Sequence, residues 1–211
     1  MKQVDDYMED GIDCGCVLHG EYYTLDYAKK LEAGLRRNFS CPIRFHIWTE
    51  KAREVPKHWH KHSLKDLGVK GPKKSWWYKT QIFRNKDFQG RLFYFDLDII
   101  ISGNLDWMLR LSSEKFWAVR DFRYLWKKNK WTINSSVMVF DTNKYADLWK
   151  KFKRNHHAIM TQYNGDQDYI DIEVPNDNKR WFDQNFVKSY RWEVMDGGID
   201  FTYRTYPNKG K

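Results

Sequence analysis

The segment 93–101 places two aspartates, Asp96 and Asp98, inside an otherwise apolar run. Such a run favours a buried β-strand, where an ionised carboxylate without a partner is costly. Because side chains two positions apart on a strand point to the same side, both aspartates are expected to face one spot. Two hard oxygen ligands suit Mg²⁺ or Mn²⁺, which in turn can hold a phosphate group. The alternative is that one aspartate caps a turn and the other faces solvent.

Composition limits the classes of protein to consider. The 211 residues suit one domain, and a hydrophobic fraction of 41% supports a core. The formal net charge of +9 favours anionic partners such as nucleotides, phosphates, nucleic acids or acidic membrane surfaces. We find neither a transmembrane run nor a signal peptide. The three cysteines lack zinc-ligand spacing, which favours reduced core thiols in a cytoplasmic protein.

The chain begins with a β-α-β pattern, which favours a parallel sheet. Residues 1–13 are expected to form a flexible leader and residues 14–211 a single domain. Strands are predicted over 14–18, 42–48, 93–101, 116–119 and 136–140, and helices over 24–37 (with Thr24 as N-cap), 76–83, 105–111 and 145–152. Residues 51–74 are expected to be irregular. Their histidines His58, His60 and His62 alternate, a pattern that can bind metal but in a lysine-rich loop is more often solvated.

Three polar segments stand out besides the aspartate pair. Lys79, surrounded by aromatic residues in 75–81, is a good point charge for a diphosphate, or else a snorkelling helix lysine. Asn134 and Ser135 open a predicted strand, where they can bind a hydroxyl-rich ligand or simply form a turn. Asp166 follows Gly165 and can cap the next helix.

Taken in order, these segments resemble the GT-A-fold glycosyltransferases related to family 8, of the glycogenin and galactosyltransferase type, in particular a small bacterial and viral group. The matching motifs are 16–23, 76–79, 96–98, 134–138 and 165–168, and together they cover most of the chain. The resemblance implies one α/β, Rossmann-like GT-A domain with a mixed, mostly parallel central sheet flanked by helices. It also implies a metal-dependent hexosyltransferase that uses a nucleotide-sugar, most often a UDP-sugar, with Mn²⁺ or Mg²⁺, and a carbohydrate or glycoconjugate acceptor.

The resemblance also implies roles for individual residues. The metal, held by Asp96 and Asp98, bridges the diphosphate, and Asp166 and Gln167 lie beside the anomeric carbon as catalytic residues. The expected donor contacts are Leu18, His19, Gly20 and Tyr23 for base and ribose, Lys79 and Asp96 for the diphosphate, and Asn134 and Ser135 for the donor sugar, with Asp168 as a further donor-binding residue. Family 8 relatives retain the anomeric configuration. An inverting enzyme would instead need a base, for which Asp166 or Asp168 could serve.

One departure concerns the third metal ligand. The relatives supply it from a C-terminal histidine, whereas here no histidine follows His157. Either the chain stops short, or the position is taken by water or by another carboxylate such as Asp196 or Asp200.

Two alternatives remain. A haloacid-dehalogenase-like phosphatase also carries Asp-x-Asp at a strand end, and Asp166 with Asp171 mimics its second acidic motif, but Ile99 and Ile100 stand where that family has Gly-Thr. The net charge and the aromatic content of 18% would suit a nucleic-acid-binding module. No binding motif supports that alternative, so no nucleic acid partner is expected. The oligomeric state is not predicted.

Overall fold

A computed structural model describes residues 4–68, 72–125, 127 and 131–195. In this part of the chain, seven strands form one sheet in the order β3-β2-β1-β4-β6-β5-β7. The strands are β1 (Ile12–Leu18), β2 (Ile43–Thr49), β3 (His60–Ser63), β4 (Arg91–Phe95), β5 (Phe116–Arg120), β6 (Ile133–Asp141) and β7 (Lys179–Trp181). Only β6 runs antiparallel to its neighbours. The predicted α/β fold with a mixed, mostly parallel sheet is therefore confirmed.

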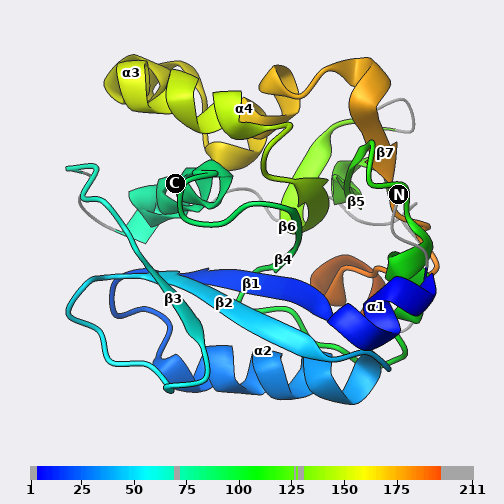
Figure 1. The fold of residues 1–211 in the computed structure, drawn as a ribbon. Helices are drawn as coiled ribbons and strands as arrows, with labels where there is room; N and C mark the ends of the chain where they lie inside the picture. The colour runs from blue at the N-terminus through cyan, green and yellow to red at the C-terminus, as the bar shows by residue number, and fades with distance from the viewer. Residues whose placement is uncertain (1–3, 69–71, 126, 128–130, 196–211) are drawn as a thin grey trace.

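Helices cover both faces of this sheet (Figure 1). Helix α2 (Leu25–Asn38) lies against β1 and β2 on one side, whereas α3 (Ala146–Gln162) and α4 (Asp166–Glu173) lie on the other. The shorter elements are the helix α1 (Val4–Asp10), the 3₁₀ segments η1 (Pro72–Phe83), η2 (Asp106–Arg110), η3 (Phe122–Leu125) and η4 (Asn176–Asn178), and the π-helical turn η5 (Tyr190–Val194). Among the described residues, no helix has both the length and the apolar character needed to cross a membrane.

Successive side chains along each strand point to opposite faces of the sheet, so the core has two parts, one on each face. On β1, Cys14, Cys16 and Leu18 point to the α2 side, where Leu31 and Leu35 of that helix pack against them. The opposite face is built mainly from aromatic side chains, among them Trp48, Trp77, Tyr94, Phe140, Phe152 and Tyr169. The three cysteines are free and buried, as expected.

The N-terminal segment differs from its prediction. Residues expected to be a flexible leader form α1, and the first strand begins at Ile12 rather than at Cys14. Tyr7 anchors this helix, because its ring is buried in the α2-side core and its hydroxyl accepts a hydrogen bond from Arg91 at 2.7 Å. The polar sequence of this segment did not reveal these tertiary contacts.

Three local predictions also need correction. Strand β3 lies within the segment expected to be irregular, where parallel pairing with β2 supplies its backbone hydrogen bonds. Thr24 occupies the N-cap position of α2, but its side chain makes no capping hydrogen bond. Asp166 is the first residue of α4 rather than its cap, and Gly165 holds the N-cap position.

The topology brings several chain segments together at one end of the strands, which we call the carboxyl edge of the sheet. The carboxyl ends of the parallel strands β1, β4 and β5 lie there, and open α/β sheets usually bind ligands at this end. Because β6 runs the opposite way, its first residues reach the same edge.

Candidate active site

The two aspartates follow strand β4 rather than lying within it. The strand ends at Phe95, and the Asp96 amide donates to the Ser136 carbonyl at 2.8 Å before the chain turns through Asp98. The expected strand geometry beyond Phe95 is therefore wrong. Ile99 and Ile101 pack against the α2-side core, where Ile101 lies beside Gly34 of α2, whereas Ile100 is exposed. Both carboxylates nevertheless line the same cleft.

This cleft has a volume of about 470 Å³, within the range of small-molecule sites. The residues lining it are Val17, His19, Tyr22, Tyr23, Ser75, Trp76, Lys79, Tyr94, Asp96, Leu97 and Asp98. Among the predicted site residues, the cleft thus brings together His19, Tyr23, Lys79 and the aspartate pair. Tyr22 and Trp76 remain substantially exposed on its wall, where they offer aromatic surface to a ligand.

Lys79 lies among acidic and hydroxyl groups at the floor of the cleft. Its Nζ is 2.9 Å from a carboxylate oxygen of Asp96, 3.1 Å from Ser135 Oγ and 3.4 Å from Asp166 Oδ2. The Ser135 hydroxyl in turn donates to Asp166 Oδ2 at 2.9 Å. Burial alone would lower the pKa of Lys79, but the carboxylates of Asp166 and Asp96 raise it, so the ammonium stays charged.

A bulge in β6 aims Ser135 into this network. Ala118 of β5 pairs with Met138, whereas the next residue, Val119, pairs with Asn134, so extra residues are accommodated on β6. Asn134 Oδ1 accepts the backbone N–H of Ser136 at 3.0 Å, which holds the distorted backbone. Bulges commonly re-aim side chains beside active sites.

The first turn of α4 adds further polar groups to this edge. Asp166 is 5% exposed and joins the Lys79 network, and Gln167 Nε2 donates to Asp121 Oδ2 at 3.0 Å. Asp168 instead accepts from Asn164 Nδ2 at 3.2 Å and makes no described contact with the network. Gly165 lets this helix approach Trp76, since a Cβ there would lie 3.3 Å from Trp76 Nε1.

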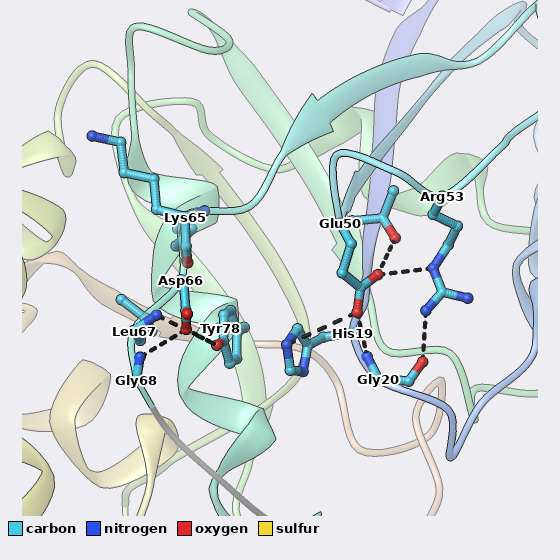
Figure 2. A network of polar contacts seen from close by, with 11 residues as sticks. His19, Gly20, Glu50, Arg53, Lys65, Asp66, Leu67, Gly68 and Tyr78 are labelled. Atoms are coloured by element: carbon cyan, nitrogen blue, oxygen red, sulfur yellow. Dashed lines mark hydrogen bonds and ion pairs between the residues drawn. The ribbon is translucent and has the colours of Figure 1, made fainter.

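The turn after β1 is held in place by an ion pair between Glu50 and Arg53 (Figure 2). Glu50 accepts the Gly20 N–H at 2.5 Å and Arg53 Nε at 2.8 Å, while the Arg53 guanidinium donates to the Gly20 carbonyl at 2.6 Å. Burial alone would raise the pKa of Glu50, but these hydrogen bonds lower it to about 2. Gly20 adopts φ +72°, a conformation that favours glycine.

His19 and Tyr78 form a stacked pair beside this turn (Figure 2). Their ring centroids are 3.6 Å apart with planes 14° from parallel, and the Tyr78 hydroxyl donates to Asp66 at 3.1 Å. Burial lowers the pKa of His19, which favours the neutral imidazole. The side chain of Leu18 is fully buried in the α2-side core, so only its backbone can meet a ligand.

Two tyrosines donate hydrogen bonds to the aspartate pair. The Tyr94 hydroxyl donates to Asp96 Oδ1 at 2.6 Å, and the Tyr23 hydroxyl donates to Asp98 Oδ2 at 3.2 Å. Burial, reinforced by the neighbouring carboxylates, raises the pKa of both phenols. Burial also raises the pKa of Asp96, against the opposing effect of Lys79.

The aspartate pair suits a divalent cation only in part. In the described residues, no group of three or more His, Cys, Asp or Glu side chains is arranged to hold a metal ion. Two carboxylates do match the way Mg²⁺ is usually bound, by one or two carboxylates together with substrate phosphates and water. The alternative third ligands Asp196 and Asp200 lie outside the described residues.

Two of the three alternating histidines, His58 and His62, lie within hydrogen-bond distance of other side chains. His62 Nε2 lies 2.9 Å from His46 Nδ1, and His46 Nε2 lies 2.9 Å from Asp13 Oδ1. His58 is mostly exposed and lies 3.1 Å from Glu32.

Sequence analysis missed Tyr94, Glu50 and Asp121. Asp121 had a usable signal, because it lies two residues after the predicted strand 116–119; in the structure it directly follows β5, as Asp96 follows β4. Glu50 likewise directly follows β2, and Tyr94 was hidden as one aromatic among many in an apolar run.

Comparisons with known proteins report the same fold. No protein-family model matches the chain, and no curated protein is significantly similar to it. The solved structure of the glycosyltransferase GlyE from Streptococcus pneumoniae TIGR4 aligns with a TM-score of 0.55 and 14% identity over 80% of this chain. The galactosyltransferase LgtC, solved with donor and acceptor sugar analogues, aligns with a TM-score of 0.56 and 14% identity over 81% of this chain.

The aligned region is a different share of each neighbour, since it spans 45% of the GlyE chain and 73% of the LgtC chain. At these identities the likeness establishes the fold that this chain shares with glycosyltransferases.

Proposed function

We propose that this protein is a glycosyltransferase that transfers a hexose from a nucleotide-sugar donor of the UDP type to a carbohydrate or glycoconjugate acceptor. The observation that carries the proposal is the convergence of Asp96, Asp98 and Lys79 in one cleft at the carboxyl edge of the sheet. A fold shared with glycosyltransferases, one of them solved with donor and acceptor sugar analogues, supports it.

A divalent cation, Mn²⁺ or Mg²⁺, would be held by Asp96 and Asp98 together with the donor diphosphate. When bound, it supplies positive charge that offsets the charge developing on the leaving diphosphate. The ammonium of Lys79, 2.9 Å from Asp96, already compensates one of the two carboxylates. We therefore expect tight metal binding only when the diphosphate adds its own oxygens to the site.

Each of the remaining predicted residues would contact one part of the donor. The His19–Gly20 turn and Tyr23 would receive the base and ribose, with Tyr22 and Trp76 as aromatic walls. Asn134, Ser135 and Asp168 would serve the donor sugar, whose hydroxyl groups need fixed polar partners. Lys79 would face both the diphosphate and the sugar.

The side-chain contacts favour retention of configuration. An inverting enzyme needs a free carboxylate base within reach of the acceptor hydroxyl. Asp166 is already engaged, because its Oδ2 accepts a hydrogen bond from the Ser135 hydroxyl and pairs with the Lys79 ammonium. In the retaining route, the departing phosphate takes the acceptor proton, and Gln167 stabilises the positive charge on the anomeric carbon.

The same contacts argue against the phosphatase alternative. Asp171, which would complete the second acidic motif, accepts the backbone N–H of Ile133 at 3.0 Å and pairs with Lys179 at 3.1 Å. It is therefore committed to holding the start of β6.

Calorimetric titration of UDP with and without Mn²⁺ tests the proposal. Wild-type protein should bind UDP more tightly with the metal, and Asp98→Ala should abolish that difference while leaving the fold intact, because Asp98 is exposed. Asp26→Ala, an exposed aspartate on α2, is the matched control and should bind as wild type does. Unchanged metal-dependent affinity in Asp98→Ala would contradict the assignment of Asp98 as a metal ligand.

If UDP binds as expected, a screen of UDP-hexoses for hydrolysis would identify the donor.

A further inference from the structure

We propose that Asp121 is a positioning residue that fixes the orientation of the Gln167 side-chain amide, so that Oε1 rather than the NH₂ group is presented to the donor sugar. This inference rests on the proposed function for its catalytic consequence. Its structural part, the orientation of one amide by one carboxylate, stands on the contacts described below.

Asp121 is itself held rigidly at the end of β5. Its backbone N–H donates to the Thr132 carbonyl at 2.9 Å, and its own carbonyl accepts from Tyr124 at 3.0 Å. Its Oδ1 accepts the backbone N–H of Arg123 at 2.9 Å, and its Oδ2 accepts Arg123 Nε at 2.8 Å. With only 5% of the residue exposed, the carboxylate has one available orientation.

The orientation of the amide follows from donor and acceptor chemistry. A carboxylate paired with an arginine only accepts hydrogen bonds, whereas a glutamine amide has a donor side and an acceptor side. The group of Gln167 that lies 3.0 Å from Asp121 Oδ2 must therefore be Nε2. The opposite side, Oε1, faces away from Asp121 and accepts no hydrogen bond from the described residues.

This polarity matters for the proposed reaction. Gln167 is next to Asp166, which reaches the Lys79 network at the cleft floor. Positive charge builds on the anomeric carbon as the sugar–phosphate bond breaks, and a carbonyl oxygen stabilises it whereas an NH₂ group would repel it. Because Asp121 already orients the amide dipole of Gln167, the dipole needs no reorganisation during the reaction. Preorganised dipoles of this kind stabilise a charged transition state most effectively.

The structural part is tested by NMR of the Gln167 side-chain amide, assigned as the signal lost in Gln167→Met. We expect Asp121→Asn to shift this signal and to speed its hydrogen exchange at least tenfold, because an asparagine can donate as well as accept and no longer selects one amide orientation. Asp141→Asn is the matched control, since Asp141 also ends a strand and accepts the N–H two residues on, at 2.8 Å. It should leave the Gln167 signal unchanged.

A second measurement uses the wild-type protein once the signal is assigned. The side-chain NH₂ of Gln167 should exchange with solvent at least tenfold more slowly than an exposed side-chain amide, because Asp121 accepts its hydrogen bond. An amide signal that is unchanged in Asp121→Asn and exchanges as fast as an exposed amide would overturn the inference.

The catalytic part is tested by a double-mutant cycle. Asp121→Asn should lower kcat about ten- to a hundredfold with little change in the donor KM, and should cost nothing further in a Gln167→Met background. Independent, multiplying losses would show that Asp121 does not act through Gln167. If no donor is turned over by the wild-type protein, the proposed function fails while the NMR measurements still decide the structural part.

Discussion

The ammonium of Lys79 lies 2.9 Å from the carboxylate of Asp96, at a position where the lysine side chain is only 9% exposed. The Asp166 carboxylate, 3.4 Å away on the other side, makes the group a buried triad with one positive and two negative charges. Such a triad is stable only while its members remain paired, and its net negative charge is available to a cation.

Replacing the lysine should therefore destabilise the protein. Lys79→Met leaves two largely buried carboxylates without their cation, and we expect a loss of about 3–5 kcal/mol in the free energy of unfolding. Urea denaturation at pH 7 measures it. Adding Asp166→Asn to this variant removes one of the two unpaired carboxylates and should restore part of the free energy of unfolding. Equal stability of Lys79→Met and wild type would mean that the triad is not formed.

The pKa of Asp96 should respond to its acidic neighbour. Burial raises this pKa, Lys79 opposes the rise, and Asp166 adds to it. Asp166→Asn should accordingly lower the pKa of Asp96. The pH below which metal-dependent UDP affinity is lost, measured by calorimetry from pH 4 to 7, should then be lower in the variant. A midpoint that is higher than in wild type, or unchanged, would contradict the coupling between Asp96 and Asp166.

A side chain at Gly20 should destabilise the turn after β1. Its φ of +72° is strained for an alanine although a Cβ there meets no atom within 4 Å, so Gly20→Ala should cost about 1–2 kcal/mol. Gly103→Ala is the matched control, because a Cβ there is equally free and its φ lies outside the strained range. Thermal unfolding compares the two variants, and similar losses in both would show that the backbone conformation at Gly20 is not the cause.

Protonation of His62 should weaken the β3 edge of the sheet. Burial, reinforced by the neighbouring His46 and His60, lowers the pKa of His62 to about 4. The unfolded chain takes up this proton near pH 6.5, so the group's contribution to stability is complete above pH 6.5 and is lost as pH falls towards 4. Allowing for partial exposure, we expect about 1–2 kcal/mol over this range.

Denaturation of His62→Gln against wild type at several pH values isolates that contribution. The difference in unfolding free energy between the two proteins should change between pH 6.5 and 4 and remain constant above pH 6.5. A constant difference throughout would show that His62 titrates normally in the folded protein.

Much of the fold was readable from local patterns. The strand predicted over 14–18, helix α2 and strand β2 follow from alternation and helical spacing, and the β-α-β order predicted the parallel pairing of the two strands. Helix α1 and strand β3 were not readable, because their stability comes from tertiary contacts: the burial of Tyr7 against the core and the pairing of β3 with β2.

The sequence by itself pointed to the segment where the candidate site lies, since an acidic pair inside an apolar run is expensive to bury without a partner. Only the tertiary structure decided which groups meet there. Lys79 is 17 residues from Asp96, and Asp121 is 46 residues from Gln167. Such contacts depend on strand order, on the reversed direction of β6 and on its bulge beside Asn134. Local periodicity reports which side of an element is buried, but it carries no information on which distant element packs against that side.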